Sequence, residues 1–472
     1  MLIILLCAVG AAHSATHEYV VAVDAALTRL AVTARYATHV THIAARSRSA
    51  ARFLESATTC DSSSALAARG RSLALPDTGI DCLLYSIDLR GAAAADRRGT
   101  LLERSNIVAS PSVWLWRPRI RDDDEIIVRF DLPAGVQVAV PWQPMPGRDN
   151  RYRLLASPES GTAIAVFGTF DTALERVAGA ELSISILRVA DPIDSAPLID
   201  WIRDTAANVA QAYGRFPNPF ISVVVVPVGG SLRGSDMAVP FGRVIRDGGE
   251  TVELLIDEHR PIADYYVDWT ATHEFSHLML PYVQHRQRWI SEGFAQYYQN
   301  LLLARSGRYT ADEAWQKLVE GLQRGRMSSP DLSPNAAAAI GERNSRMKIY
   351  WSGAALALLA DVELRRRSNG LQSLDGVLEE LQRCCLPSAR SWSGPELLGH
   401  LDAMLEEPVF MPLYRKHADI PGFPDVWPLL ERLGVKVEAN RVILSDGAQL
   451  AAIRRAMTAP LSSSVMHADE QH

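Results

Sequence analysis

Two histidines four residues apart, in the stretch His273-Glu274-Phe275-Ser276-His277, carry the strongest chemical signal in the chain. On a helix, residues at this spacing lie one turn apart on the same face, so both imidazoles can reach one metal ion. Glu274 then stands at the edge of that site, where a carboxylate can take a proton from metal-activated water. A lone buried histidine is more often a hydrogen-bonded core residue, but two histidines at this spacing with a glutamate between them favour a metal site.

A candidate for the third ligand, Glu292, follows His277 by 15 positions. A catalytic zinc ion takes three protein ligands and keeps one open position, and two histidines with one glutamate are such a set. The polar connection 284–288 lets the chain turn back, so that a second helix can run beside the first. The alternative is a carboxylate that only stabilises a helix start, which leaves Trp289 and the tyrosine pair 297–298 without a role.

The elements that must position these residues can also be predicted. A helix is expected from Pro261, a favourable first-turn residue, to just before Pro281. Its apolar residues cover most of its circumference, which predicts a buried helix. Before it, strand patterns at 183–189, 221–228, 239–245 and 251–256 and a helical pattern at 197–213 predict an α/β unit.

The regions on either side have different patterns. Alternating apolar residues broken by glycine and proline predict a β-sandwich-like domain at the N-terminal end. Trp114 and Trp116 within it are better explained as core than as a ligand surface. The chain after Asp375 is predicted to be helical. The predicted fold class is therefore multidomain α+β, with domains at 16–178, 179–370 and 371–472.

Composition excludes some functions. The chain has 472 residues and a net charge of −6, which gives no electrostatic reason to expect nucleic acid or an anionic membrane as a partner. No segment has the length of a transmembrane helix. Met1–Ala15 has an apolar centre followed by small residues, which is typical of a signal peptide and predicts export to a periplasm or to the outside.

Four cysteines remain after this leader. Cys60 and Cys82 flank a polar loop and can form a disulfide in an oxidising compartment. For the adjacent Cys384 and Cys385, a vicinal bridge and two buried thiols are both open. No cysteine pair has the spacing of zinc ligands.

The motif His-Glu-x-x-His followed by Trp-x-x-Glu-Gly-x-Ala-x-Tyr-Tyr resembles the gluzincin metallopeptidases, whose thermolysin-like catalytic domain takes its third ligand from the next helix. Within that group the chain is most similar to the glycyl aminopeptidase family and more distantly to the aminopeptidase N family. The stretches 349–356 and 361–367 share this likeness. The resemblance implies that His273, His277 and Glu292 bind one Zn²⁺ ion, that Glu274 is the general base, and that the Tyr350 hydroxyl stabilises the oxyanion.

The chain departs from these families at one strand before the metal helix. Their aminopeptidases hold the substrate amine with a glutamate in a Gly-x-Met-Glu-Asn or similar motif. The best match here, residues 234–239, has Ala238 at the glutamate position and Asp236 as the nearby acid. The sequence thus predicts an exported zinc peptidase, aminopeptidase or endopeptidase, acting on a peptide or protein substrate. A zinc-containing peptide- or protein-binding module with little turnover is the alternative.

Overall fold

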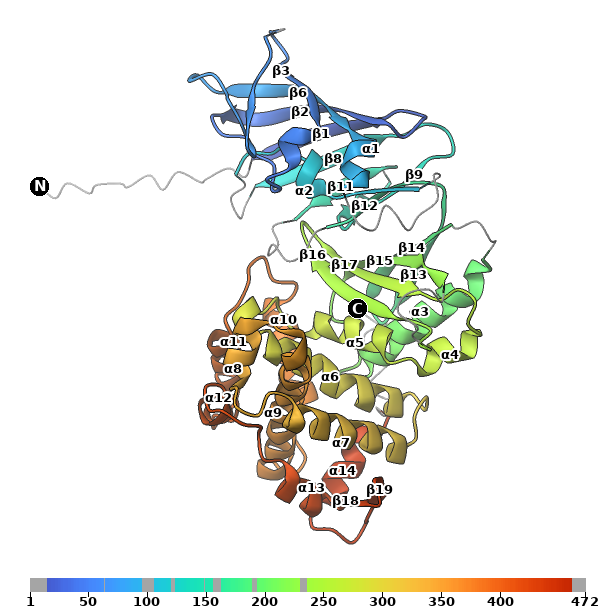
Figure 1. The fold of residues 1–472 in the computed structure, drawn as a ribbon, viewed down its shortest axis with the longest axis vertical. Coiled ribbons are helices and arrows are strands. Elements are labelled where there is room, and N and C mark those ends of the chain that lie inside the picture. Colours follow the sequence, from blue (N-terminus) through green and yellow to red (C-terminus); the bar gives the residue numbers. More distant parts are fainter. Residues whose placement is uncertain are drawn as a thin grey trace, which may run out of the picture. The chain divides into compact units, whose positions relative to one another are not determined.

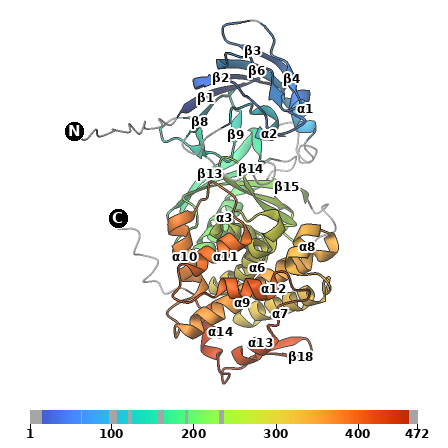
Figure 2. The same cartoon turned by 90° about the vertical axis from the view of Figure 1, so that its left-hand side faces the viewer.

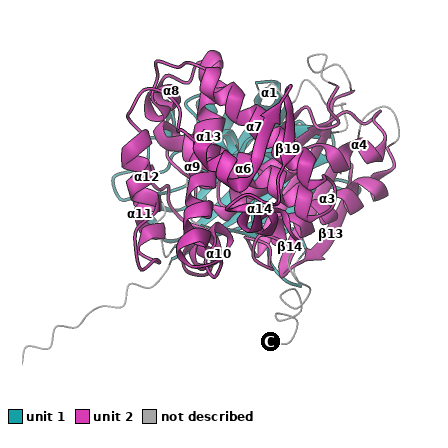
Figure 3. Ribbon diagram, turned by 90° about the horizontal axis from the view of Figure 1, so that it is seen from below, with its two compact units in different colours: residues 1–156, 162–169 teal, residues 157–161, 170–472 magenta. Residues whose placement is uncertain are grey.

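A computed structural model describes the protein over residues 15–62, 64–95, 106–119, 124–147, 149–155, 163–188, 193–229 and 236–460. The predicted signal peptide lies outside these residues apart from Ala15. The chain forms two compact units, residues 1–156 with 162–169, and residues 157–161 with 170–472 (Figure 3). Each unit is described by itself.

The first unit is built on two β-sheets (Figure 1). The larger sheet has seven strands, in the order β10 (Gln143–Pro144), β11 (Arg151–Leu154), β8 (Glu125–Asp131), β1 (Thr16–Val23), β2 (Arg29–Val40), β6 (Ile80–Asp88) and β3 (Leu54–Thr59). The smaller sheet has the order β7 (Asn106–Ala109), β12 (Ala165–Gly168) and β9 (Gln137–Ala139). The short elements are β4 (Ala68–Arg69), β5 (Ser72–Leu73), α1 (Leu89–Ala94) and α2 (Pro111–Trp114).

Alternating burial along the strands gives this unit its core. On β1 and β2 every second side chain is buried over most of the strand, as the period of two in the sequence predicts. Trp114 and Trp116 are fully buried, and Trp114 makes edge contacts with Phe130 and Trp142. Cys60, just after β3, is disulfide-bonded to Cys82 on β6. The prediction of an N-terminal β domain is confirmed.

The second unit begins with a five-stranded sheet. Its order is β13 (Phe170–Val177), β14 (Ala180–Leu187), β15 (Phe220–Pro227), β17 (Glu250–Ile256) and β16 (Phe241–Arg246). Strands β14, β15 and β17 are parallel, and β16 runs antiparallel to β17 at the edge. Because β13 and β14 pair along their whole length, β13 is part of this unit, although the sequence places it in the domain 16–178.

Helices make up most of the remaining chain (Figure 2). They are α3 (Ser195–Ala210), α4 (Ile262–Val267), α5 (Thr270–Ser276), α6 (Arg288–Arg305), α7 (Ala311–Met327), α8 (Pro334–Ile340), α9 (Arg346–Arg367), α10 (Leu374–Cys385), α11 (Gly394–Asp402), α12 (Phe410–His417), α13 (Trp427–Leu433) and α14 (Ala451–Thr458). The mixed α+β architecture with a helical C-terminal part is confirmed, with one addition, the hairpin of β18 (Val435–Glu438) and β19 (Arg441–Leu444). The predicted peptidase segment 179–370 and helical segment 371–472 both lie in this unit, and the boundary at 370 stays a prediction.

The prediction of one continuous helix from Pro261 to Leu280 is wrong. Asp268 is extended (φ −74°, ψ 129°) and separates α4 from α5. Its carboxylate accepts hydrogen bonds from the backbone N–H groups of Thr270 and Val239, both at 2.9 Å. These bonds satisfy a free donor at the start of α5 and also tie that start to the chain just before β16.

In the part of the chain that the structure describes, no helix combines the length and the apolar character needed to cross a membrane.

Candidate metal centre

The two histidines of the motif lie in the middle of α5 and just after its end. His273 is on the helix, and His277 begins a 3₁₀ turn that continues it to Met279. Their ring centroids are 4.8 Å apart. Every residue of α5 is buried, because the helix packs between β16, α3 and α6. The sequence prediction of two imidazoles on one face of a buried helix is met here.

Glu292 on α6 completes a cluster of three possible ligands. Its Oε2 lies 3.4 Å from Nε2 of His273 and 3.5 Å from Nε2 of His277. One ligand atom from each residue lies within 4.8 Å of the others. The side chains of His273, His277 and Glu292 are 2%, 11% and 23% exposed, so the cluster is reached from the side of Glu292.

Further side chains fix the orientation of both imidazoles. Nδ1 of His273 is 2.9 Å from Oε1 of Gln299, and Nδ1 of His277 is 3.0 Å from Oγ of Ser291. A hydrogen-bond partner at Nδ1 leaves Nε2 directed toward Glu292. In metal sites, such a bond to the ring nitrogen that does not bind the metal orients the histidine. Two imidazole nitrogens and one carboxylate oxygen are a donor set that suits zinc.

The carboxylate and the imidazoles of the cluster shift one another's pKa values. Burial acts to raise the pKa of Glu292, but the imidazoles of His277 and His273 hold that pKa well below its usual range. Burial acts to lower the pKa of His273, but Glu292 and Glu274 raise it above the usual value. The Glu292 carboxylate is therefore ionised and can serve as an anionic ligand.

Glu274 lies beside this cluster, against the edge strand of the sheet. Burial raises the pKa of Glu274, with a further contribution from Glu292, while the two imidazoles and Arg243 act to lower it. A Cβ placed on Gly242 of β16 would lie 2.6 Å from Cγ of Glu274. The strand can pass this close to the carboxylate only because residue 242 has no side chain.

Tyr350 reaches the cluster from α9. Its ring centroid is 5.8 Å from that of His273, and its hydroxyl is close enough to Glu292 to feel the charge of that carboxylate. The Glu292 charge, followed by burial, raises the pKa of Tyr350 well above its usual value, so the hydroxyl keeps its proton. A protonated hydroxyl at this place can donate to an oxygen that develops negative charge.

A close approach of α6 and α9 brings Glu292 and Tyr350 together. A Cβ on Gly293 would lie 2.1 Å from Cα of Gly353, and a Cβ on Gly353 would lie 1.9 Å from the carbonyl oxygen of Trp289. Glycines at both positions therefore let the two helix backbones touch, one residue after Glu292 and three after Tyr350.

The tyrosine pair that follows Glu292 lies on the buried side of α6. The Tyr297 hydroxyl donates to Asp361 at 2.7 Å, and the Tyr298 hydroxyl donates to Asp375 at 2.9 Å. Arg365 pairs with both aspartates, at 3.0 and 3.2 Å. The two tyrosine hydrogen bonds tie α6 to α9 and to the start of α10, and the Arg365 ion pairs hold the two acceptor aspartates in place.

Residues 234–239 correspond to the strand motif that holds the substrate amine in the aminopeptidases. The described part of this segment, from residue 236, has no buried carboxylate. Ala238 is buried, and its carbonyl accepts from the backbone N–H of Asp257 at 2.9 Å. The Asp236 side chain is fully exposed, with one oxygen 3.7 Å from Arg260. Asp236 therefore does not take the place of the missing glutamate inside the protein.

Sequence reasoning missed Gln299, Ser291 and Gly242. Gln299 follows Glu292 by seven residues, which is two helical turns, so the spacing places it on the same face of α6. Ser291 is the neighbour of Glu292 and gives no periodic signal. Gly242 depends on the packing of β16 against α5, which no local pattern encodes.

Comparison with known proteins finds a match to one protein family and a likeness in fold to solved structures. Residues 280–355 match the M61 glycyl aminopeptidase family, a segment that contains Glu292 and Tyr350. None of the curated proteins matches the chain significantly.

Among solved structures, an aminopeptidase N family protein from Idiomarina loihiensis superposes with a TM-score of 0.65 at 14% identity, over 89% of this chain and 79% of that one. An M1 zinc metallopeptidase from Deinococcus radiodurans, in a mutant bound to a Tyr-Ser-Ala substrate, gives 0.52 at 11% identity, over 87% and 95%. At these identities the likeness is one of fold.

The peptidase family match, the fold and the His-His-Glu cluster together support a zinc metallopeptidase. More particularly, the resemblance to the glycyl aminopeptidase family, and more distantly to the aminopeptidase N family, is confirmed.

Proposed function

We propose that the protein hydrolyses peptide bonds with one zinc ion held by His273, His277 and Glu292. The observation that carries the proposal is the convergence of the two Nε2 atoms on Oε2 of Glu292, at 3.4 and 3.5 Å, beside the buried carboxylate of Glu274. A structural role alone gives no reason to place a fourth ionisable side chain, Glu274, at the edge of such a cluster.

Each group of the proposed site has a separate role in the reaction. When bound, zinc supplies a Lewis acid that polarises the substrate carbonyl and acidifies water. The Glu274 carboxylate accepts the proton of the attacking water and then passes it to the nitrogen of the leaving amine. The Tyr350 hydroxyl donates a hydrogen bond to the carbonyl oxygen as that oxygen becomes negative.

The likeness to aminopeptidases points to substrates cleaved near the amino terminus, but the position that would bind the amine is Ala238. A methyl group cannot pair with an ammonium ion. We therefore propose a peptidase that does not require a free substrate amine, with the edge strand β16 beside Glu274 available to pair with an extended peptide. Export to a periplasm or to the outside, from the leader at Met1–Ala15, is part of the same proposal.

The decisive experiment replaces Glu274 by Gln, which keeps the shape of the side chain and removes its basicity. We expect cleavage of a mixed peptide library, followed by mass spectrometry, to fall by about 10²–10⁴ while zinc content stays at one ion per chain. The matched control is Glu431→Gln on an exposed helix position. Unchanged cleavage by zinc-loaded Glu274→Gln would refute the mechanism.

A second comparison uses the same library with free and with acetylated amino termini. Similar rates on both support the loss of the amine requirement that Ala238 indicates, and cleavage of free peptides alone contradicts it. If zinc-loaded wild-type protein binds peptides but cleaves neither set, the chain is a binding module and not an enzyme.

A further inference from the structure

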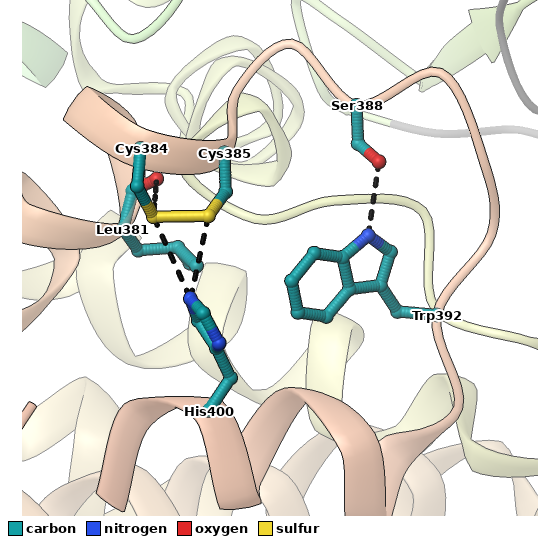
Figure 4. The surroundings of a disulfide bond; sticks show 6 residues. All are labelled: Leu381, Cys384, Cys385, Ser388, Trp392 and His400. Atoms are coloured by element: carbon teal, nitrogen blue, oxygen red, sulfur yellow. Dashed lines mark hydrogen bonds between the residues drawn. A yellow bond between two sulfur atoms is a disulfide. The ribbon is translucent and has the colours of Figure 1, made fainter. Parts of the chain in front are cut away.

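A second cluster of possible metal ligands lies at the junction of α10 and α11, away from the motif residues in the sequence. Cys384 and Cys385, at the end of α10, are joined by a disulfide (Figure 4). Nε2 of His400, on α11, lies 3.5 Å from Sγ of Cys384 and 3.3 Å from Sγ of Cys385. The imidazole therefore points one nitrogen at both sulfur atoms.

The imidazole is held in place by the loop between the two helices. The ring of Trp392 meets that of His400 edge-on at 5.3 Å, and its indole N–H donates to Oγ of Ser388 at 2.9 Å (Figure 4). The backbone of Trp392 is itself bonded at both ends: its N–H donates to the carbonyl of Tyr282, and its carbonyl accepts from Gln284, both at 2.9 Å. A fixed ring next to two sulfurs is a prearranged ligand set.

The donors match a soft or borderline cation. The two sulfur atoms and the imidazole nitrogen lie within 4.8 Å of one another in the disulfide form. Once the disulfide is reduced, two thiolates and one imidazole suit Cu⁺, Zn²⁺ or Cd²⁺, which prefer sulfur and nitrogen to oxygen. Cys384 is exposed, and Cys385 and His400 are half-buried, so both a reductant and a cation can reach the cluster. Of the two alternatives for Cys384 and Cys385, the vicinal bridge is the one found, and two buried thiols is wrong because the sulfurs are bonded and Cys384 is exposed. Among the described residues the only other such cluster is the one at His273, which has no sulfur.

We propose that Cys384, Cys385 and His400 form a redox-gated site for a soft metal ion. A dithiol reductant transfers two electrons and two protons to the Cys384–Cys385 bond and itself becomes a disulfide. The two thiols that result lose their protons as the cation binds to both sulfurs and to Nε2 of His400. A disulfide oxidant takes two electrons from the two thiolates and is itself reduced to two thiolates. The Cys384–Cys385 bond is thereby restored, both sulfur ligands are removed and the cation is released.

The other disulfide supplies the matched control. Cys60 and Cys82 are also joined, but no cluster of three ligands includes them among the described residues. Reduction alone therefore does not predict a metal site there, and the distinguishing feature of the proposed site is His400.

The test is a Cd²⁺ titration of the full-length, zinc-loaded protein after reduction by a water-soluble phosphine. Ultraviolet absorption from sulfur-to-cadmium charge transfer reports only sites that contain thiolate, so binding at the His273 cluster is not seen. We expect the band to saturate at one equivalent in reduced wild type and in Cys60→Ser/Cys82→Ser. We expect no band in unreduced protein or in Cys384→Ser/Cys385→Ser.

The role of His400 is tested by His400→Ala and His400→Asn, with circular dichroism to show that each variant is folded. Both should bind Cd²⁺ more weakly by at least the roughly tenfold that even indirect partners of a metal contribute. Wild-type affinity in both variants would overturn the three-ligand site. So would a band that survives in Cys384→Ser/Cys385→Ser. Because the readout is independent of peptide cleavage, failure of the peptidase proposal leaves this result unaffected.

Discussion

Replacing Tyr350 by Phe removes one hydroxyl and retains the ring, which makes it the sharpest test of how the site stabilises negative charge. Loss of one preorganised donor to an oxyanion costs about 3–4 kcal/mol of barrier lowering, or roughly 10²–10³ in kcat. We expect a fall of this size for Tyr350→Phe.

The structure predicts that little else changes in this variant. The backbone at the start of α9 is fixed by the contact of Gly353 with α6, and the Tyr350 ring stays 5.8 Å from that of His273. The lost hydroxyl lies in the field of the Glu292 carboxylate, which is also beside the two imidazoles. A single hydrogen bond contributes about 1 kcal/mol, so the free energy of unfolding and the zinc content should stay close to wild type.

The assay measures kcat and KM on a peptide that wild type cleaves, with zinc content and Tm measured on the same preparation. Tyr309→Phe is the matched control, because it also removes a buried donor, the hydroxyl that bonds to the carbonyl of Val267 at 2.9 Å. A fall in kcat for Tyr350→Phe of less than about tenfold would refute the oxyanion role. A fall that follows an equal loss of zinc would show that the hydroxyl acts through Glu292 alone.

Three further changes test the surroundings of the cluster. Gly242→Ala places a methyl 2.6 Å from Cγ of Glu274. The resulting shift of about 1 Å should lower kcat roughly 100-fold at unchanged zinc content. A normal kcat would show that β16 moves away from Glu274 without displacing its carboxylate. Gln299→Leu removes the partner of an Nδ1 atom and should weaken zinc binding roughly 10–100-fold in competition with a chelator, and an unchanged Kd would contradict the orienting role. Gly353→Ala forces α6 and α9 apart and should lower the free energy of unfolding by about 1–3 kcal/mol in a denaturant titration, whereas Gly376→Ala, with no atom within 4 Å, should not.

Local patterns predicted the parts of the site that local geometry determines. The helical repeat alone places His273 and His277 on one face, and the 15-residue spacing to Glu292 correctly implied a returning helix. The break at Asp268 was missed because its cause is a hydrogen bond to Val239, 29 residues away. A helix pattern cannot show that the carboxylate of Asp268 also accepts a hydrogen bond from a distant segment of the chain.

The cluster of Cys384, Cys385 and His400 could not be predicted from local sequence patterns at all. The spacing rules for zinc ligands look for cysteines with two to four residues between them, and Cys384 and Cys385 are adjacent. His400 joins them only because the loop around Trp392 turns α11 back against the end of α10 (Figure 4). The contact exists in the tertiary structure and leaves no signal in the sequence.

Two kinds of constraint together set the precision of the zinc site. His273 and His277 are fixed relative to each other by one helical turn, which any amphipathic helix provides. Glu292 is fixed by the depth at which α6 can pack, and Gly293 and Gly353 set that depth by letting backbone meet backbone. A larger residue at either position leaves the motif intact in the sequence but moves the carboxylate away from both imidazoles. These two glycines therefore help to position Glu292, although neither belongs to the ligand set.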